Sequence, residues 1–303
     1  MDSVSFSRVC SVLVATSFCL IGVSATSDAQ VRGYLYASVV DLDDQPVLDL
    51  TEDDFVVSVV GGTEIPVLSS VLDSKPPKIA LLLDNSNVMS EAGADPMLRT
   101  GVTEFLGILS PQHEVGLFTM ARNVQTRADF TLDRQILRSE ADRVFSDRGA
   151  GLRMMDALFD IWDERYTAED TWPVFVLVLT DGSELSDYIS DDQYNRFVND
   201  LIQRGANVHV VMFSGQGALN PLNQLGGTQK QYGMSLTENT GGFYRTINTP
   251  TGLPVVLREF ANYLNQINCK NQNLVCQTYV ESGIAKPLLT IPPPIAHLLL
   301  FFL

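Results

Sequence analysis

Basic residues are scarce in this sequence: 20 Lys and Arg residues stand against 36 Asp and Glu residues, so the formal net charge is −16 at pH 7. Proteins that bind the phosphate backbone of nucleic acids need a surface rich in Lys and Arg, and the acidic balance argues against that class of partner. Four Cys, 14 Pro and 21 Gly residues are too few for a disulfide-dense or collagen-like chain. Hydrophobic residues make up 45%, which excludes disorder as the main state.

Histidine is equally rare, with only His113, His209 and His297 in 303 residues. Ser–His or Cys–His catalysis needs a nucleophile, a base and an orienting group, and the sequence shows no such set. Residues 213–217 read Phe-Ser-Gly-Gln-Gly, which is not the Gly-x-Ser-x-Gly turn of a hydrolase. The sequence therefore predicts a protein that is not an enzyme.

The first 29 residues have the composition of a secretory signal peptide. Arg8 precedes an uncharged, largely apolar stretch at residues 9–27, and small residues offer cleavage points after Ala25 or Ala29. An uncleaved membrane anchor is the alternative, which six Ser and Thr residues within the stretch weaken. We expect an exported protein of the periplasm, the cell envelope or the extracellular space.

Signal cleavage would leave Cys269 and Cys276 as the remaining cysteines. In an oxidising compartment this close pair could form a disulfide, and free thiols are the alternative. One Cys pair with three scattered His residues does not make a zinc site.

The C-terminal part divides into an extension at residues 269–286, predicted as a strand or hairpin, and a tail at residues 287–303. The tail holds no charged residue, and Pro292, Pro293 and Pro294 exclude a helix through its middle. The nine residues beyond them are too short to span a bilayer. Its role stays open, and it and an uncleaved signal are the only segments that could contact a membrane.

Residues 30–75 predict a small β-sandwich-like unit. Three short apolar runs, each punctuated by Gly or Asp and without helical periodicity, lie at residues 34–40, 54–60 and 65–72.

Residues 76–268 follow a different pattern, in which buried strands alternate with helices. The expected strands are at residues 79–83, 114–120, 124–132, 173–179, 207–213 and 243–247. The expected helices are at residues 97–109, 133–145, 154–165, 192–204 and 251–267. This alternation predicts an α/β domain with a Rossmann-like, mostly parallel sheet covered by helices on both faces.

A carboxylate follows each of two continuous apolar runs that predict buried strands of this domain. Asp84 and Ser86 come directly after residues 79–83, and Asp181 follows residues 173–179. The carboxyl ends of parallel strands share one rim of the sheet, where open α/β sheets bind ligands. Oxygen ligands of this kind suit Mg²⁺, Mn²⁺ or Ca²⁺ rather than zinc.

The chain over residues 77–267 resembles a von Willebrand factor type A (VWA) domain, and together with the β-rich segment before it the resemblance covers residues 32–280. Asp84 and Ser86 are similar to the start of that family's metal-ion-dependent adhesion site (MIDAS), with the pattern Asp-x-Ser-x-Ser, and Asp181 to its later Asp loop. The Thr-Gly-Gly turn at residues 240–242 resembles the turn before the family's last strand, and residues 47–55 resemble the lead-in of bacterial exported "VWFA-related" proteins.

The chain departs from the family pattern at two ligand positions. The resemblance implies a second Ser where Val88 stands, and a Thr where alignment on residues 156–158 places Leu152. Mg²⁺ needs six oxygens in near-octahedral geometry, and two hydroxyl ligands are replaced here by apolar side chains. We therefore expect either a degenerate site without metal, or Mg²⁺ or Mn²⁺ held by Asp84, Ser86 and Asp181.

The resemblance implies a non-enzymatic adhesion or protein-binding module that recognises a protein partner at the rim of its sheet. Two alternatives stay open: a structural component of a cell-envelope assembly, and a metal-assisted hydrolase built on Asp84 and Asp181.

Overall fold

A computed structural model describes residues 33–40, 47, 50–59, 64–75, 77–166, 171–181, 186, 189–214, 226–266, 275–282, 287–290 and 297–300. The predicted signal peptide at residues 1–29, Cys269 and most of the tail lie outside these residues, and so does the side chain of Cys276.

Seven strands form two antiparallel sheets outside the α/β domain. They are β1 (Gly33–Val40), β2 (Val56–Val59), β3 (Glu64–Ile65), β4 (Val67–Lys75), β11 (Val275–Ser282), β12 (Pro287–Thr290) and β13 (His297–Leu300). A 3₁₀ turn at Glu52–Asp54 precedes β2. One sheet has the order β13-β1-β11-β4 and the other the order β12-β2-β3.

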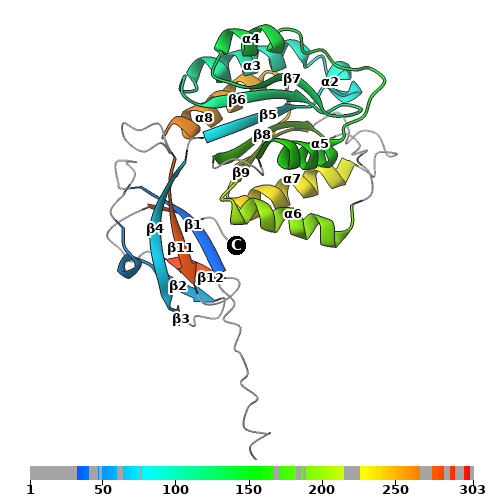
Figure 1. Cartoon of the computed structure of the whole chain (residues 1–303). Helices are drawn as coiled ribbons and strands as arrows, with labels where there is room; N and C mark the ends of the chain where they lie inside the picture. Colours follow the sequence, from blue (N-terminus) through cyan, green and yellow to red (C-terminus); the bar gives the residue numbers. More distant parts are fainter. Residues whose placement is uncertain are drawn as a thin grey trace, which may run out of the picture. The chain divides into compact units, whose positions relative to one another are not determined.

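Both sheets combine strands from before and after the α/β domain. Tyr36 of β1 pairs with Tyr279 of β11, and Leu72 of β4 pairs with Thr278 of the same strand, so β11 is the central partner of both (Figure 1). β12 pairs with β2 in the second sheet. The segment predicted as a C-terminal extension and part of the predicted tail thus join the β-rich unit, and the α/β domain is inserted between its strands.

The α/β domain is built on a six-stranded sheet with the order β10-β9-β8-β5-β6-β7. Its strands are β5 (Pro77–Leu83), β6 (Glu114–Thr119), β7 (Gln125–Thr131), β8 (Trp172–Thr180), β9 (Asn207–Phe213) and β10 (Tyr244–Ile247). Every neighbouring pair is parallel except β6 with β7. The predicted fold class, a mostly parallel α/β sheet, is confirmed.

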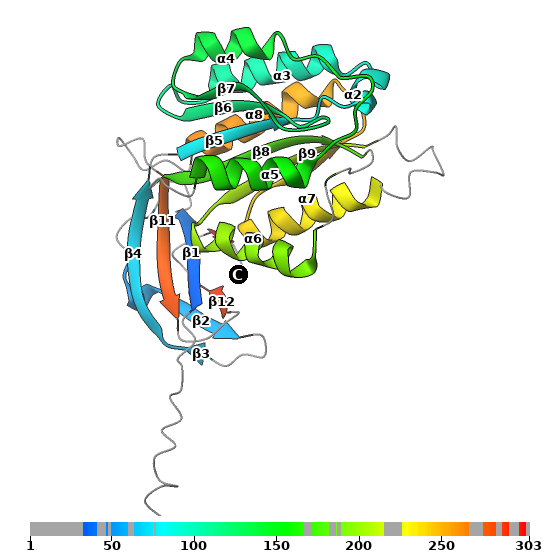
Figure 2. The ribbon, with the colours of Figure 1, turned by 45° about the vertical axis from the view of Figure 1, so that its right-hand side comes forward.

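The helices cover both faces of this sheet (Figure 2). They are α2 (Asn87–Glu91), α3 (Asp95–Ile108), α4 (Arg134–Ala141), α5 (Met154–Ile161), which continues as one π-helical turn η2 (Trp162–Tyr166), α6 (Asp191–Gln203), α7 (Gly226–Thr240) and α8 (Gly252–Gln266). The sequence predicted the other long helices within a few residues but missed α7. None of the helices in the described ranges is long and apolar enough to cross a membrane.

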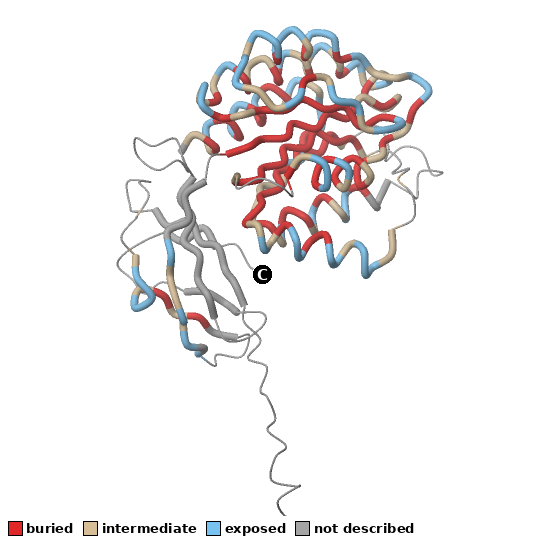
Figure 3. The backbone as a smooth tube through the Cα atoms, viewed as in Figure 1, coloured by how far each residue is buried: buried red, intermediate tan, exposed pale blue. Residues whose placement is uncertain are grey.

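Alternate side chains of the central strands enter two separate cores. Ile79, Leu81 and Leu83 of β5 pack with α3, α4 and α8, whereas Ala80 and Leu82 pack with α5, α6 and α7. All seven residues of β5 and all nine of β8 are buried (Figure 3). Strands buried on both faces read as continuous apolar runs, which is why the sequence located them well.

The Thr-Gly-Gly sequence that the resemblance placed before the last strand forms the turn between α7 and β10. Gly241 has φ +67°, a left-handed conformation that favours glycine. At Gly242 an added Cβ would lie 1.8 Å from the carbonyl oxygen of Val208, so only glycine lets the turn approach β9. Thr240 connects the same turn to β9, because its hydroxyl accepts a hydrogen bond of 3.0 Å from the Val208 N–H.

Candidate functional site

Asp84 lies directly after β5 and its side chain joins two strands. One carboxylate oxygen accepts a hydrogen bond of 2.7 Å from the Ser86 N–H. The other accepts from both the N–H (3.0 Å) and the hydroxyl of Thr180, the last residue of β8. The Asp84 N–H donates in turn to the Val178 carbonyl at 2.8 Å. Asp84 is therefore fixed between the carboxyl ends of β5 and β8.

Burial is the main influence on the charge of Asp84, whose side chain has no exposed surface. Burial raises the pKa of this carboxyl above its ordinary value, and the hydrogen bonds from Thr180 and Ser86 limit the rise. Three protein donors already serve the carboxylate, so it can hold its place without an ion.

Ser86 carries a buried polar atom at this rim that has no hydrogen bond of ordinary geometry within the described residues. The residue is 2% exposed, and its side-chain oxygen has no hydrogen-bond partner of ordinary geometry in the described part of the chain. The hydroxyl is close enough to Asp84 to lower the pKa of that carboxyl, but it does not cap α2, at whose N-terminus it stands. A buried hydroxyl in this state has capacity for an external partner.

Asp181 follows β8 and is half-buried at the same rim. Its N–H donates to the carbonyl of Phe213, the last residue of β9, at 3.1 Å. Burial raises the pKa of Tyr244 to about 12, and the negative charge of Asp181 adds to the rise. Asp84, Ser86 and Asp181 thus stand at the carboxyl ends of the adjacent strands β5 and β8, the arrangement that the sequence predicted.

The two positions that replace hydroxyl ligands differ in their surroundings. Val88 is half-buried in α2. Leu152 is 1% exposed and belongs to the apolar core with Met120 and Met154, while its backbone bridges to Ala121. The Leu152 side chain is a core residue in this fold.

The donor set does not fit a closed Mg²⁺ or Mn²⁺ site. Six oxygens are required, and the family positions supply only Ser86, Asp84 and Asp181, of which Asp84 is already held by three protein donors. Among the described residues, no group of three or more His, Cys, Asp or Glu side chains could hold a metal. Two described carboxylates near the rim already accept hydrogen bonds: Glu91 accepts from the Asn87 side-chain nitrogen at 2.6 Å, and Asp95 accepts from the Ser146 hydroxyl.

Asn85 organises the neighbouring loops, a role that the sequence did not reveal. Its side-chain oxygen accepts from the Ala121 N–H at 2.9 Å, its side-chain nitrogen donates to the Phe145 carbonyl at 3.3 Å, and its own carbonyl accepts from the Asp147 N–H at 2.7 Å. One residue thus connects the β5 exit, the β6 exit and the loop after α4. Asn is frequent in turns after strands, which was the only signal available.

No protein-family model and no curated protein sequence matches this chain. Among solved structures, it is similar to a von Willebrand factor type A protein from Catenulispora acidiphila, with a TM-score of 0.50 and 10% identity over 88% of this chain and 71% of that one. It also matches the vWF domain of the type V pili tip protein Mfa5 from Porphyromonas gingivalis, with a TM-score of 0.45 and 11% identity over 64% and 96% of the two chains.

A third match is proximal thread matrix protein 1 of the mussel byssus, solved with a zinc-occupied MIDAS motif, at a TM-score of 0.45 and 12% identity over 63% of this chain. The match spans about half of that protein, 48% of its length. Identities this low show the fold alone. The α/β domain of this chain has a VWA-like fold, and the resemblance seen in the sequence is confirmed at that level.

Proposed function

We propose that this chain is a non-enzymatic, exported protein-binding module of VWA type, which recognises its partner at the carboxyl-end rim of its six-stranded sheet without a bound metal ion. The observation that carries the proposal is the Ser86 hydroxyl, which lacks a hydrogen bond of ordinary geometry in the described chain, beside an Asp84 held by three protein donors. Such a rim offers a partner fixed polar groups on a stable scaffold, which is how loops on α/β folds acquire binding function.

Two features of the residues support metal independence. The resemblance implies hydroxyl ligands at positions 88 and 152. Leu152 packs in the apolar core, and neither Leu152 nor Val88 has a side-chain hydroxyl. The Asp84 carboxylate is satisfied by Ser86 and Thr180, so the rim keeps its geometry in the absence of an ion.

Site-specific photocrosslinking tests both parts of the proposal. A photoreactive amino acid at Arg148, exposed in the loop whose Ala150 carbonyl accepts a hydrogen bond from the Asn87 N–H, should capture the partner in an envelope extract. The same amino acid at Arg196, exposed on α6, is the matched control. Equal capture from both positions would refute the rim as the binding surface.

A chelator and metal titrations test whether partner binding needs a metal ion. We expect the Arg148 crosslink to persist in EDTA, and titration calorimetry with Mg²⁺ and Mn²⁺ to show no heat above that of an Asp84→Ala variant. A crosslink that requires added Mg²⁺, with saturable heat in the unsubstituted protein alone, would overturn metal independence and leave the rim proposal standing.

A further inference from the structure

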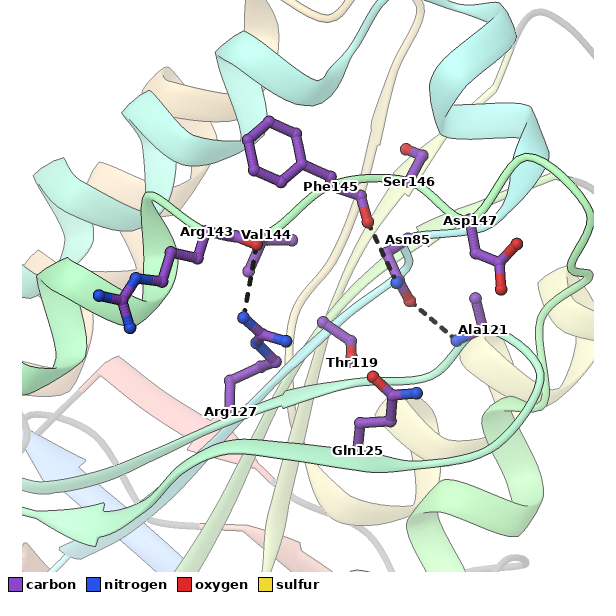
Figure 4. A pocket seen from close by; sticks show the side chains of 10 residues that line it. All are labelled: Asn85, Thr119, Ala121, Gln125, Arg127, Arg143, Val144, Phe145, Ser146 and Asp147. Carbon is purple, nitrogen blue, oxygen red and sulfur yellow. Dashed lines mark hydrogen bonds between the residues drawn. The ribbon is translucent and has the colours of Figure 1, made fainter.

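A pocket of about 190 Å³ lies beside the Asn85 loop (Figure 4). Its floor is the end of β6 and the start of β7, with Thr119 and Gln125, and its opposite wall is the segment at residues 143–147. The volume corresponds to about six waters of liquid, which is room for a small group and not for a folded element.

The walls of the pocket are held in place by hydrogen bonds to the backbone. Asn85 connects Ala121 on one side with Phe145 on the other, as Figure 4 shows. Asp147 is fixed through its N–H to the Asn85 carbonyl and through its carboxylate to Arg122 at 3.1 Å. A pocket whose walls are already bonded loses little conformational entropy when a ligand enters.

Several donors that line the pocket are not used by the fold. Thr119 is 2% exposed. Within the described chain, neither the Thr119 hydroxyl nor the side-chain amide of Gln125 makes a hydrogen bond. The Nε of Arg127 is buried without a partner, and its Nη2 makes two contacts at 3.4 Å, to Glu140 and to the Arg143 carbonyl. Contacts of that length are near the limit for a hydrogen bond, so the guanidinium has donors to spare.

The charge around the pocket is positive, against the balance of the chain. Eight of the 20 Lys and Arg residues, but only seven of the 36 Asp and Glu residues, fall at positions 99–153. At the pocket itself, Arg127 and Arg143 share the single Glu140 carboxylate, and Asp147 is paired with Arg122. One positive charge is left over, which suits a monoanion better than a dianion such as phosphate.

We propose that this pocket binds a single carboxylate group, with the Arg127 guanidinium as its charge partner and Thr119 and Gln125 as hydrogen-bond donors. Guanidinium and carboxylate match in geometry and can form two parallel hydrogen bonds. The carboxylate belongs either to a small organic acid or to a Glu or Asp side chain of a protein partner. The second source rests on the proposed function, and the first does not.

Titration calorimetry and ¹H–¹⁵N NMR on the full chain test the pocket with defined probes. The free acid is acetate, with chloride at equal ionic strength as the blank. The side-chain probe is the capped peptide acetyl-Gly-Glu-Gly-amide, with its Gln counterpart as the blank. We expect saturable binding of at least one carboxylate probe and of neither blank. Binding of both probes identifies a general carboxylate pocket, and binding of the Glu peptide alone identifies a partner side chain.

Variants inside and outside the pocket locate the binding. Arg127→Gln and Thr119→Val should each weaken the affinity at least about tenfold, because each removes a hydrogen bond to a charged group. Arg138→Gln removes the same charge from exposed α4 outside the pocket and should leave the affinity within about twofold. Gln125→Ala, at an exposed position, serves as the second pocket variant if Arg127→Gln fails to fold.

Failure of this inference is separable from failure of the proposed function. No saturable binding of either carboxylate probe, or equal weakening by Arg138→Gln, would overturn the pocket. A pocket that fails these tests while the Arg148 crosslink persists leaves the rim proposal intact. Binding of acetate in the absence of any rim crosslink would support the pocket alone.

Discussion

Acidification should weaken this fold through one buried side chain, His209 on β9. His209 is 1% exposed and its ring lies 5.5–5.7 Å from the rings of Phe243, Phe260 and Tyr263. Its Nδ1 accepts a hydrogen bond of 3.1 Å from the Phe243 N–H, which requires an unprotonated nitrogen. Burial lowers the pKa of His209 from 6.5 to about 3.

The sign and size of the effect follow from that shift. The unfolded chain binds a proton at His209 below pH 6.5 and the folded chain does not, so the stability that His209 contributes is complete above pH 6.5 and falls as the pH drops toward 3. The slope is about 1.4 kcal/mol per pH unit, which amounts to about 2 kcal/mol at pH 5 and about 3.4 kcal/mol at pH 4. The raised pKa of Asp84 acts in the opposite direction, since a protonated Asp84 is easier to bury.

Urea unfolding at pH 8, 6, 5 and 4, for the unsubstituted protein and a His209→Asn variant, isolates this contribution. The Asn side-chain oxygen can accept from Phe243 in place of Nδ1 and has no group that titrates in this range. Asp84 and the other carboxylates are common to both proteins, so the difference between their free energies of unfolding should shrink by about 2 kcal/mol from pH 8 to pH 5. A difference that stays constant over this range would refute the reasoning.

Three further predictions concern the room for a side chain at two glycines and the two family ligand positions that lack a hydroxyl. Gly242→Ala should destabilise the fold by at least about 2 kcal/mol in urea unfolding, because its Cβ would meet the Val208 carbonyl. Gly107→Ala, at an exposed position of α3 where the added Cβ would meet only the end of the Arg138 side chain at 3.4 Å, should instead stabilise it by about 0.5–1 kcal/mol, and a destabilisation would contradict this reasoning. Val88→Ser combined with Leu152→Thr should lower the melting temperature without metal, since Leu152 is in the core, but should gain a Mg²⁺-dependent rise that the unsubstituted protein lacks. An equal Mg²⁺ response in both proteins would show that these positions do not limit metal binding.

The sequence predicted the sheet well because the sheet is buried on both faces. Residues 79–83 and 173–179 are continuous apolar runs, and the structure extends each of them by only a residue or two. α7 was missed because its sequence, with Gly, Thr, Ser and Asn spread through it, carries little apolar periodicity. Its buried Gln229, Leu236 and Thr240 are held by tertiary packing, which local pattern does not report.

The β-rich unit could be predicted only in part, for a reason of topology. Its strands before the α/β domain have recognisable β patterns, but their partners β11, β12 and β13 come about 200 to 260 residues later. Pairing between strands so far apart leaves no mark in local composition. The apolar tail at residues 287–303 therefore had no interpretable role in the sequence, although two of its segments have strand partners in the fold.

The rim carboxylates were predictable because strand exits in parallel sheets converge at one edge, whereas the Arg127 pocket was not. The pocket depends on β7, which runs antiparallel to β6, and on the loop after α4, which Asn85 holds across it. No spacing rule brings residues 85, 119, 127 and 145 together. Its signal in the sequence was the enrichment of Arg in one stretch of an acidic chain, which becomes meaningful once the fold places Arg127 and Arg143 at one cavity.

At the rim, the Asp84 side chain has a structural role, whereas the Ser86 hydroxyl is available for binding. Asp84 is the residue that points most directly to a metal site. Its carboxylate, however, already accepts hydrogen bonds from Ser86 and Thr180, and burial raises its pKa and so favours the protonated form. Its structural role is to join β5 to β8, which needs no ion. The Ser86 hydroxyl has a weaker structural role, since it lowers the pKa of Asp84 but neither caps α2 nor completes a hydrogen bond of ordinary geometry. Ser86, rather than either carboxylate, is therefore the residue whose substitution by Ala should affect partner binding while leaving the fold unchanged.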